Sequence, residues 1–278
     1  MRIPPALGEE WGRDRDWLKD LPRLATECAE QWDLVLEEPV DSPHSLVVPA
    51  GEVVLKLNAP SHFEAEHEAD ALERWAGRGA VRLVARDDMR RALLIERCRP
   101  GTPLWDTEAD ESEVMGGLLP RLWAAPQLPH PFRLLADEAR RWLEEVPRRY
   151  ELAGRPFEQR LLSFALELFR TVDRGASALV NQDLHGGNVL RAQREPWLVI
   201  DPKPLVGERE ANGVGVLRNA AHDGVAAVRR WLDVLESLDL DRERLRAWGV
   251  AHALAWGWDE EHGWSAWSVE AACVVFEA

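Results

Sequence analysis

The sequence predicts an α+β protein of two lobes, a small β-rich N-terminal lobe and a larger helical C-terminal lobe. Short β-like runs gather before residue 97, and helical periodicity dominates afterwards, with one β-like island at 178–200. Between the two regions lies RCRPGTP (97–103), whose prolines and glycine are typical of a linker. In a doubly wound sheet, strands and helices would alternate throughout, so this order argues against that fold. We expect an N-terminal lobe at 1–96, a hinge at 97–103 and a C-terminal lobe at 104–278.

The first third combines a helical run with short strands. Apolar residues recur at helical spacing over 17–32, and we expect Pro22 to divide this run into two pieces. The turn signal Pro49-Ala50-Gly51 predicts a hairpin. Ser61 and Glu64 form a capping-box pattern at the start of a helix. The expected strands are Leu34–Glu38, Ser45–Val48, Val53–Leu57, Val81–Ala85 and Ala92–Glu96, and the expected helix is Ser61–Ala76.

The remainder of the chain is mainly helical in pattern. The β-like island there consists of Ala178–Asn181, Val189–Arg191 and Trp197–Ile200. The expected helices are Glu111–Ala124, Leu134–Arg149, Phe157–Arg174, Val225–Leu238, Arg242–Trp256 and Trp264–Phe276.

The charge balance limits the partners that the protein can bind. With 34 Lys and Arg against 49 Asp and Glu, the net charge is −15. Such a field repels nucleic acid and anionic membranes and attracts a cationic small molecule, although it could also serve solubility alone. The three cysteines lie far apart, and the first twenty residues contain no apolar signal segment. We therefore expect a cytoplasmic protein without disulfides.

The β-like island contains the candidate catalytic and metal-binding residues. It reads ALVNQDLHGGNVLRAQREPWLVIDPKP from residue 178, with Asp183 in a polar loop, Asn188 at the start of a strand and Asp201 at the end of another. This order of Asp, Asn and Asp resembles the catalytic loop and metal-binding aspartate of protein-kinase-like phosphotransferases. There the first Asp accepts the proton of the substrate hydroxyl, and the Asn and second Asp hold Mg²⁺ on the nucleotide phosphates.

Two upstream features occur in the order that this resemblance requires. Lys56 lies in an apolar strand, where such kinases place the lysine that binds the α- and β-phosphates of ATP. Glu68, twelve residues later on the expected helix, is our candidate for its ion-pair partner, with Glu64 and Glu66 as competitors. In kinases the adenine bonds to backbone groups of the hinge, which here places it at Glu96 to Cys98.

A longer match identifies a family. The string NQDLHGGNVLRAQREPWLVIDPKPLVGERE, with HEADALERWAGRGAVRL and LLIERCRPGTPL upstream, resembles the aminoglycoside/hydroxyurea antibiotic-resistance kinases of the streptomycin 6-kinase type. The resemblance spans about residues 32–210. It implies a bilobal protein-kinase-like fold, ATP, Mg²⁺ and transfer of the γ-phosphoryl group to a hydroxyl of a small molecule. In that reading Asp183 is the catalytic base, Asn188 and Asp201 hold the metal, and Lys56 and Glu68 position the triphosphate.

The sequence departs from the family pattern at several places, among them Pro202-Lys203 after Asp201, where protein kinases have Phe-Gly. The His-Gly that usually precedes the catalytic Asp is Asn181-Gln182, and we expect Asn to support the loop through the backbone as His does. No glycine-rich G-x-G-x-x-G cap is present, so segment 41–48 must cover the phosphates through backbone groups near Ser45. Where many small-molecule kinases have an aromatic residue and Asp, this chain has Ala211-Asn212, which leaves the internal support of the loop open.

The acceptor is the least determined part of the prediction. Asp259, Glu260 and Glu261, among four nearby tryptophans, would suit a guanidinium-bearing aminoglycoside, although the tryptophans could simply pack helices together. A kinase of another small metabolite and a nucleotide-binding pseudokinase stay open. A hydrolase with a metal on Asp183, His185 and Asp201 is a third alternative, but no second histidine has metal-ligand spacing nearby.

Overall fold

The computed structural model describes residues 2–12 and 14–278, which form two compact units. The first unit comprises Met1–Thr102 and Leu190–Asp201, and the second comprises Pro103–Val189 and Pro202–Ala278. The chain first crosses between the units within the segment expected to be the hinge. Residues 190–201, which we expected in the helical lobe, cluster instead with the first unit. They are held there by backbone bonds, among them Gly101 N–H to Arg191 O and Val81 N–H to Val199 O.

A four-stranded antiparallel sheet forms the centre of the first unit. Its strands run in the order β1 (Ser45–Ala50), β2 (Val53–Asn58), β4 (Ala92–Glu96) and β3 (Leu83–Asp87). The predicted hairpin is confirmed, with Ala50 opposite Val53 and Gly51 in the left-handed region at φ 63°. The expected strand at 34–38 does not form, and that segment leads only to an isolated bridge between Val40 and Val47.

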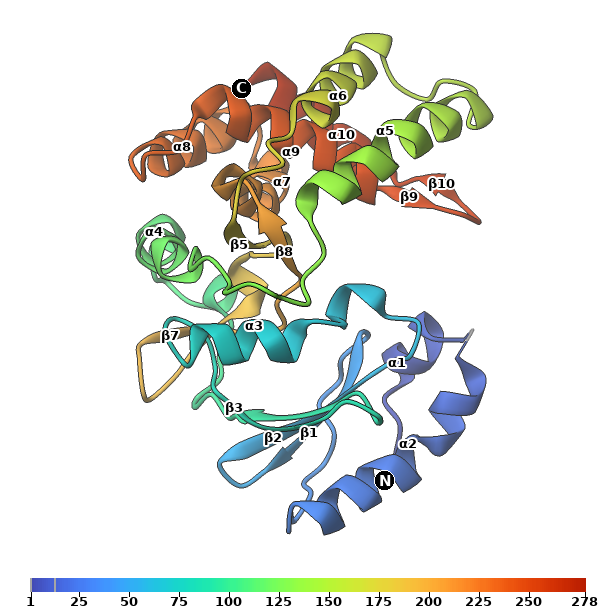
Figure 1. The fold of residues 1–278 in the computed structure, drawn as a ribbon, viewed down its shortest axis with the longest axis vertical. Helices are drawn as coiled ribbons and strands as arrows, with labels where there is room; N and C mark the ends of the chain where they lie inside the picture. Colours follow the sequence, from blue (N-terminus) through green and yellow to red (C-terminus); the bar gives the residue numbers. More distant parts are fainter. Residues whose placement is uncertain (1, 13) are drawn as a thin grey trace. The chain divides into compact units, whose positions relative to one another are not determined.

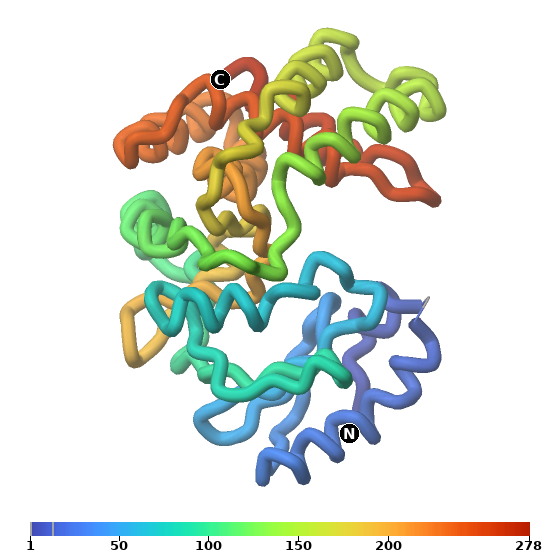
Figure 2. Tube along the Cα trace, in the orientation of Figure 1, coloured from blue at the N-terminus to red at the C-terminus, as the bar shows by residue number. Residues whose placement is uncertain are grey.

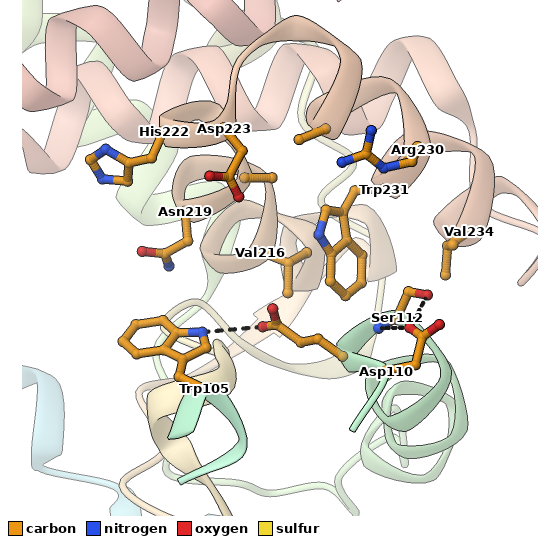
Figure 3. A pocket seen from close by; sticks show the side chains of 13 residues that line it. Trp105, Asp110, Ser112, Val216, Asn219, His222, Asp223, Arg230, Trp231 and Val234 are labelled. Carbon is orange, nitrogen blue, oxygen red and sulfur yellow. Dashed lines mark hydrogen bonds between the residues drawn. The ribbon is translucent and has the colours of Figure 1, made fainter. Parts of the chain in front are cut away.

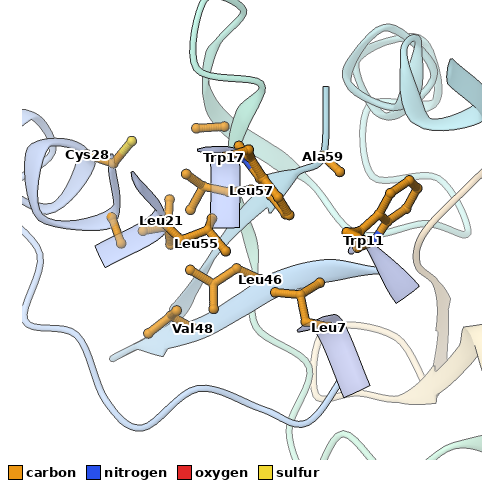
Figure 4. Close-up of a cluster of buried hydrophobic side chains, with 12 residues drawn as sticks. Leu7, Trp11, Trp17, Leu21, Cys28, Leu46, Val48, Leu55, Leu57 and Ala59 are labelled. Atoms are coloured by element: carbon orange, nitrogen blue, oxygen red, sulfur yellow. The ribbon is translucent and has the colours of Figure 1, made fainter. Parts of the chain in front are cut away.

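The two faces of this sheet have different tasks. Helices α1 (Pro5–Glu10) and α2 (Arg15–Gln31) supply a buried apolar cluster against one face of β1 and β2, as Figure 4 shows. Leu55 and Leu57 point into this cluster, because alternate residues of a strand share a face. Lys56, between them, therefore points to the opposite face, along which α3 (Glu68–Trp75) runs (Figure 1).

Two sequence predictions in this unit are wrong. Pro22 does not divide the N-terminal helix, because α2 continues through it from Arg15 to Gln31. The single backbone bond that a proline removes is offset by the packing of Leu21, Ala25 and Cys28 against the sheet. Ser61 does not cap a helix either, since its hydroxyl donates to Asp14. A short 3₁₀ turn follows, and α3 begins only at Glu68.

The second unit is a helical assembly around one central helix, α9 (Arg242–Trp256). This helix is buried on most sides and contacts α5, α6, α7, α8 and α10, which explains its weak amphipathic pattern. The path of the chain through these helices can be followed in Figure 2. The other helices are α4 (Glu111–Leu122), α5 (Leu135–Leu152), α6 (Gln159–Thr171), α7 (Val214–Ala220), α8 (Val225–Glu236) and α10 (Ala266–Glu277).

Short strands complete both units. The island forms β5 (Ala178–Asn181), β6 (Val189–Arg191) and β7 (Trp197–Val199), close to the predicted bounds. The sequence analysis missed β8 (Pro204–Gly207), which pairs antiparallel with β5, and the short hairpin of β9 (Trp258–Asp259) and β10 (Gly263–Trp264). Polar loop 182–188 begins where β5 ends, so the β5–β8 pair sets its position. Across the residues that the structure describes, no helix is long and apolar enough to cross a bilayer.

Candidate active site

Lys56 is the centre of a buried ion cluster in the first unit. Its Nζ donates to both carboxylate oxygens of Glu68, at 2.7 and 2.8 Å, and to Oδ1 of Asp201 at 2.7 Å. Burial disfavours the ammonium charge, but the two carboxylates outweigh this effect, so the pKa of Lys56 is raised. Of the three glutamates considered from the sequence, Glu68 is the one that bonds the lysine. A charged lysine is thus held in one orientation by two carboxylates.

A chain of hydrogen bonds fixes Glu68 from behind. The Ser45 hydroxyl donates to Oδ1 of Asn58 at 2.5 Å, and Nδ2 of Asn58 donates to Oε2 of Glu68 at 3.0 Å. All three side chains are buried. The Ser45 hydroxyl is therefore used inside the unit, and a nucleotide contact by the backbone near Ser45 stays a prediction.

Asp201 is held at the end of the segment that joins the first unit from far along the chain. Its backbone lies in the left-handed region at φ 49°, which is uncommon for a residue with a Cβ and is found at functional positions. Arg194, in the turn between β6 and β7, anchors this segment. It donates to Glu96 at 2.8 Å and to the carbonyl oxygens of Gly77 and Ala80 at 2.7 and 2.9 Å. The carboxylate of residue 201 is thereby tied to the same unit as Lys56.

The expected adenine site lies at the end of β4. The carboxylate of Glu96 is committed to Arg194, and its backbone N–H donates to Arg82 O. In contrast, the backbone N–H and C=O of Cys98 make no hydrogen bond to any residue that the structure describes. Burial raises the pKa of the Cys98 thiol to about 12, so the side chain is neutral. A free donor and acceptor beside a neutral side chain fit the predicted backbone recognition of adenine, which stays a prediction.

The catalytic loop has the internal support that the sequence left open. Oδ1 of Asn181 accepts from the backbone N–H groups of Asp183 and Lys203, at 3.2 and 2.9 Å, as expected for the Asn that replaces His. The backbone N–H of Asn181 in turn donates to Oδ1 of Asn212 at 2.8 Å. Asn181 and Asn212 are both fully buried. Two buried asparagines thus hold the backbone of the loop that contains Asp183.

Asp183 is paired with a residue that sequence analysis missed. Its Oδ1 accepts from Nη2 of Arg218, on α7, at 2.9 Å. Nε2 of His185 lies farther from the same oxygen, at 3.8 Å. His185 itself stacks on Trp105, with ring centroids 4.7 Å apart. The carboxylate therefore has one close ionic partner among the described residues and a second oxygen with which to accept a proton.

The side-chain nitrogen of Asn188 is bound within the loop. Its Nδ2 donates to the carbonyl of Asp183 at 3.1 Å, which leaves Oδ1 for another partner. An amide oxygen and the carboxylate of Asp201 are hard oxygen donors of the kind that Mg²⁺ prefers. Throughout 2–12 and 14–278, no three His, Cys, Asp or Glu side chains come together as a metal site.

Two glycines allow the close approaches around this loop. A Cβ on Gly186 would lie 2.3 Å from Trp105 and 2.8 Å from the carboxylate of Glu111. A Cβ on Gly215 of α7 would lie 2.1 Å from the carbonyl oxygen of Leu184. A Cβ at position 186 would force the side chains of Trp105 and Glu111 to move, and one at position 215 would meet backbone atoms, so position 215 requires glycine. The second one lets α7 lie directly against the loop and bring Arg218 to Asp183.

A pocket of about 670 Å³ opens beside the catalytic loop within the second unit (Figure 3). Its walls come from the start of α4, from α7 and from α8, with Trp105 at one side and Trp231 at another. The residues that line it are Trp105, Asp110, Glu111, Ser112, Val216, Asn219, Ala220, His222, Asp223, Ala227, Arg230, Trp231 and Val234. Three carboxylates against one guanidinium make this pocket acidic.

Glu111 connects the pocket to the loop. It accepts from Trp105 Nε1 at 3.3 Å and from the backbone N–H of Gly186. Burial raises the pKa of Glu111, and the negative charge of Asp223 adds to the effect. A partly buried carboxylate with a raised pKa in a pocket marks a functional candidate, because a bound cation would relieve its desolvation.

The predicted acceptor residues lie elsewhere in this unit. Asp259, Glu260 and Glu261 are exposed in the turn between β9 and β10. Asp259 bonds the backbone N–H groups of Glu261 and His262, and Glu260 pairs with Arg149 at 3.1 Å. None of the three lines the pocket. Their role in acceptor binding stays a prediction.

Sequence reasoning missed three residues of this site. Glu111 and Asp223 look like ordinary surface acids, and Arg218 is one of 31 arginines in the chain. A usable signal for Arg218 was its place on α7, shortly after the catalytic string, but that helix of seven residues was not predicted. For Glu111 the start of a helix was predicted correctly, but its proximity to Gly186 could not be.

Comparisons with known proteins give matches over most of the chain. The family described as aminoglycoside/hydroxyurea antibiotic resistance kinase matches residues 36–263. A streptomycin 6-kinase of Streptomyces griseus is 36% identical over 289 residues, covering 96% of this chain and 93% of that protein. A hydroxyurea phosphotransferase of Kitasatospora aureofaciens is also 36% identical, over 86% of this chain and 73% of its own.

Solved structures share the fold at low sequence identity. The choline kinase LicA of Streptococcus pneumoniae superposes with a TM-score of 0.65 at 12% identity, covering 92% of this chain and 98% of that one. A thermostable mutant of aminoglycoside phosphotransferase APH(4)-Ia, in a ternary complex with ADP and hygromycin B, gives 0.63 at 13%, over 91% and 97%. The predicted bilobal kinase-like fold class is confirmed.

Proposed function

Because this chain belongs to the aminoglycoside/hydroxyurea antibiotic resistance kinases, we propose that it inactivates an aminoglycoside such as streptomycin. The reaction would move the γ-phosphoryl group of ATP to a hydroxyl of the antibiotic. The chain is a small-molecule kinase, and what is proposed is its donor, its acceptor and the residues that act. The cytoplasm, where ATP is abundant, is the proposed compartment.

The bonding of Lys56 is the observation that carries this proposal. A buried ammonium held by Glu68 and Asp201 is suited to a triphosphate, because it needs no reorganisation when the phosphates arrive. Lys56 would bind the α- and β-phosphates, with Glu68 fixing its position. The unpaired backbone groups of Cys98 would bind the adenine edge.

Asp183 would act as the base. The acceptor hydroxyl donates its proton to the Asp183 carboxylate as its oxygen forms a bond to the γ-phosphorus. The bond between that phosphorus and the β,γ-bridging oxygen breaks, and ADP leaves. Asn181 and Asn212 support this step by holding the loop in place. Catalysis here is mainly positioning and electrostatics.

The oxygen donors of the site fit Mg²⁺. Asn188 and Asp201 would hold the ion, as the free amide oxygen of the first and the carboxylate of the second suggest. When bound, Mg²⁺ would neutralise charge on the β- and γ-phosphates.

The acidic pocket is our proposed acceptor site. Glu111 and Asp223 would attract the amino or guanidino groups of an aminoglycoside, and the tryptophan faces would stack on its cations and rings. Its volume of about 670 Å³ lies in the range of sites for drug-sized ligands. Hydroxyurea, the acceptor named for one relative, has only a few heavy atoms and would leave most of this pocket unfilled. The pocket therefore favours the larger acceptor.

The test is a phosphorylation screen with one matched pair of variants. Purified full-length protein is supplied with ATP, with or without Mg²⁺, and with streptomycin, hygromycin B, hydroxyurea or choline. Formation of ADP and of the phosphorylated product is followed. Asp183→Asn should lower kcat by about 10²- to 10⁴-fold without changing the melting temperature much. Asp239→Asn makes the same chemical change at an exposed position and should be neutral.

Each alternative has its own outcome. Wild-type turnover by Asp183→Asn would refute the assignment of the base. A product from choline or another metabolite alone would show a kinase with a different acceptor. Stabilisation by Mg²⁺ and ATP without any product would indicate a pseudokinase, and no effect of nucleotide at all would overturn the proposal.

A further inference from the structure

Arg218 occupies an unusual place beside the catalytic carboxylate. Its guanidinium carbon lies 5.5 Å from the ring centre of Trp256, on α9, and 5.5 Å from that of Trp267, on α10. Its Nη2 donates to Oδ1 of Asp183 at 2.9 Å. The loop that contains Asp183, α9 and α10 thus all contribute a contact to this one cation.

The guanidinium of Arg218 is held by aromatic faces as well as by its bond to Asp183. The Nε of Arg218 is buried and has no hydrogen-bond partner among the residues described. An arginine would ordinarily satisfy most of its five N–H groups, but here the two indoles supply cation–π attraction to a partly desolvated guanidinium. The ionic contact of Arg218 is therefore directed at Asp183.

The indoles are themselves held in place. Trp267 donates through Nε1 to Nδ1 of His222, a residue of the acidic pocket, at 3.1 Å. Trp256 packs on His252, with ring centroids 4.4 Å apart. His252 is fully buried, and burial together with the nearby Arg218 charge holds its pKa well below the usual value. A neutral His252 therefore adds no second positive charge near Arg218.

We propose that Arg218, clamped between Trp256 and Trp267, is a positioning residue that orients the Asp183 carboxylate for proton transfer. By binding Oδ1, it turns the other oxygen toward the acceptor hydroxyl. This inference rests on the proposed function, since it takes Asp183 as the base. It predicts an effect on the chemical step rather than on binding of either substrate.

Lysine cannot replace Arg218 in the slot formed by Trp256 and Trp267. A guanidinium is planar and stacks between two aromatic rings, whereas an ammonium is a compact point charge that keeps its hydration. The shorter reach of lysine also moves its charge away from Asp183. The slot is therefore specific for a planar cation, so the experiment compares a planar cation with a compact one.

The experiment uses the full chain and compares Arg218→Ala, Arg218→Lys and Arg218→Met. With streptomycin as acceptor, or whichever acceptor the screen identifies, Arg218→Ala should lower kcat about 100-fold while both KM values stay within a few-fold. Millimolar guanidinium chloride should restore part of kcat in Arg218→Ala, and methylammonium chloride should not. Arg218→Lys should lose nearly as much activity as Arg218→Ala. Arg230→Ala, an arginine of the pocket outside the clamp, is the control for rescue and should gain nothing from guanidinium.

A second measurement does not depend on turnover. The indole N–H resonances of Trp256 and Trp267, assigned with single Trp→Phe variants, should shift when guanidinium is added to Arg218→Ala. They should shift much less in Arg218→Ala/Asp183→Ala, which lacks the carboxylate. This keeps the inference testable even if the wild-type protein phosphorylates no acceptor in the screen.

The two proposals fail in different ways. Wild-type kcat in folded Arg218→Met, or equal rescue by methylammonium, would overturn the role of Arg218 and leave the kinase assignment standing. A wild-type protein without turnover would contradict the proposed function. Absence of any resonance shift with guanidinium would show that no such slot exists.

Discussion

The two charged clusters of this protein are built in different ways. Around Lys56, the lysine bonds two carboxylates and Asn58 bonds one of them, so the cluster is a closed network inside one unit. Around Asp183, one arginine meets one carboxylate, and aromatic rings hold the arginine. The first cluster resists change because every group is paired. The second leaves a carboxylate oxygen available for chemistry.

This difference matches the two tasks proposed for the clusters, nucleotide binding and proton transfer. In the proposed function, nucleotide binding needs a charge that is fixed in advance, and the paired groups of the Lys56 cluster would provide it. The proposed proton transfer needs a carboxylate that is oriented yet still able to accept a proton, and Asp183 with its single ionic contact to Arg218 would provide it. The predictions below test this contrast, beginning with the largest effect.

Lys56→Met should produce the largest loss. It leaves the buried carboxylate of Glu68 and the partly buried carboxylate of Asp201 without their cation, which costs about 3–5 kcal/mol of stability. It also removes the charge for the triphosphate, so kcat/KM for ATP should fall by about 10²- to 10³-fold. Urea unfolding and initial-rate kinetics measure the two effects. Lys19→Met, at an exposed lysine, should change neither, and a near-normal Lys56→Met would remove the basis of the comparison.

Glu208→Gln should destabilise the second unit without touching either cluster. Glu208 accepts from Arg244 at 2.6 and 2.7 Å, from Trp248 at 2.8 Å and from the backbone of Asp173 at 2.6 Å. The variant should lose about 3 kcal/mol at neutral pH, measured by urea unfolding.

The pH dependence of that loss follows from the pKa of Glu208. Burial alone would raise it, but the bonds from Arg244, Asp173 and Trp248 outweigh burial and hold it below the usual value. The stabilisation is thus present above the unfolded-state pKa and disappears as the pH falls through the lowered folded-state pKa. Wild type and Glu208→Gln should converge in strong acid. A constant difference there would contradict this, and Glu236→Gln, at an exposed glutamate, is the control.

Glu111→Gln should weaken acceptor binding about 10-fold in KM and leave the ATP KM unchanged. Since burial raises the pKa of Glu111, the wild-type acceptor KM should rise as the pH falls through that raised pKa, and the variant should show a flatter profile. The charged form is the destabilised one, so the variant should be slightly more stable at neutral pH. Glu113→Gln, on the exposed side of α4, is the control. Equal KM values would place the acceptor outside the pocket.

Ser45→Ala should have the smallest effect. It removes the donor to Asn58 but leaves the ion pair of Lys56 and Glu68 in place, so stability should fall by about 1 kcal/mol. The ATP KM should change less than about threefold, because the hydroxyl acts through Asn58. A much larger rise in the ATP KM would mean that the Ser45 hydroxyl contacts the nucleotide itself.

Much of the fold was predictable because its signals are local. Helix α9 was predicted with its observed bounds, and the hairpin of β1 and β2 followed from its turn residues. Missed elements were short or depended on distant partners, such as β8, which forms only against β5. The predicted break at Pro22 was wrong for the same reason, because packing against the sheet outweighed the local helix-breaking preference of proline.

From the sequence alone came the two-part architecture, the ordered set Lys56, Glu68, Asp183, Asn188 and Asp201, and the family. These could be recognised because spacing along a strand or loop is itself information about chemistry. Only the tertiary structure revealed the acidic pocket at Glu111, the return of residues 190–201 to the first unit and the clamp on Arg218. Each of these depends on contacts between segments far apart in the chain, which local periodicity does not encode.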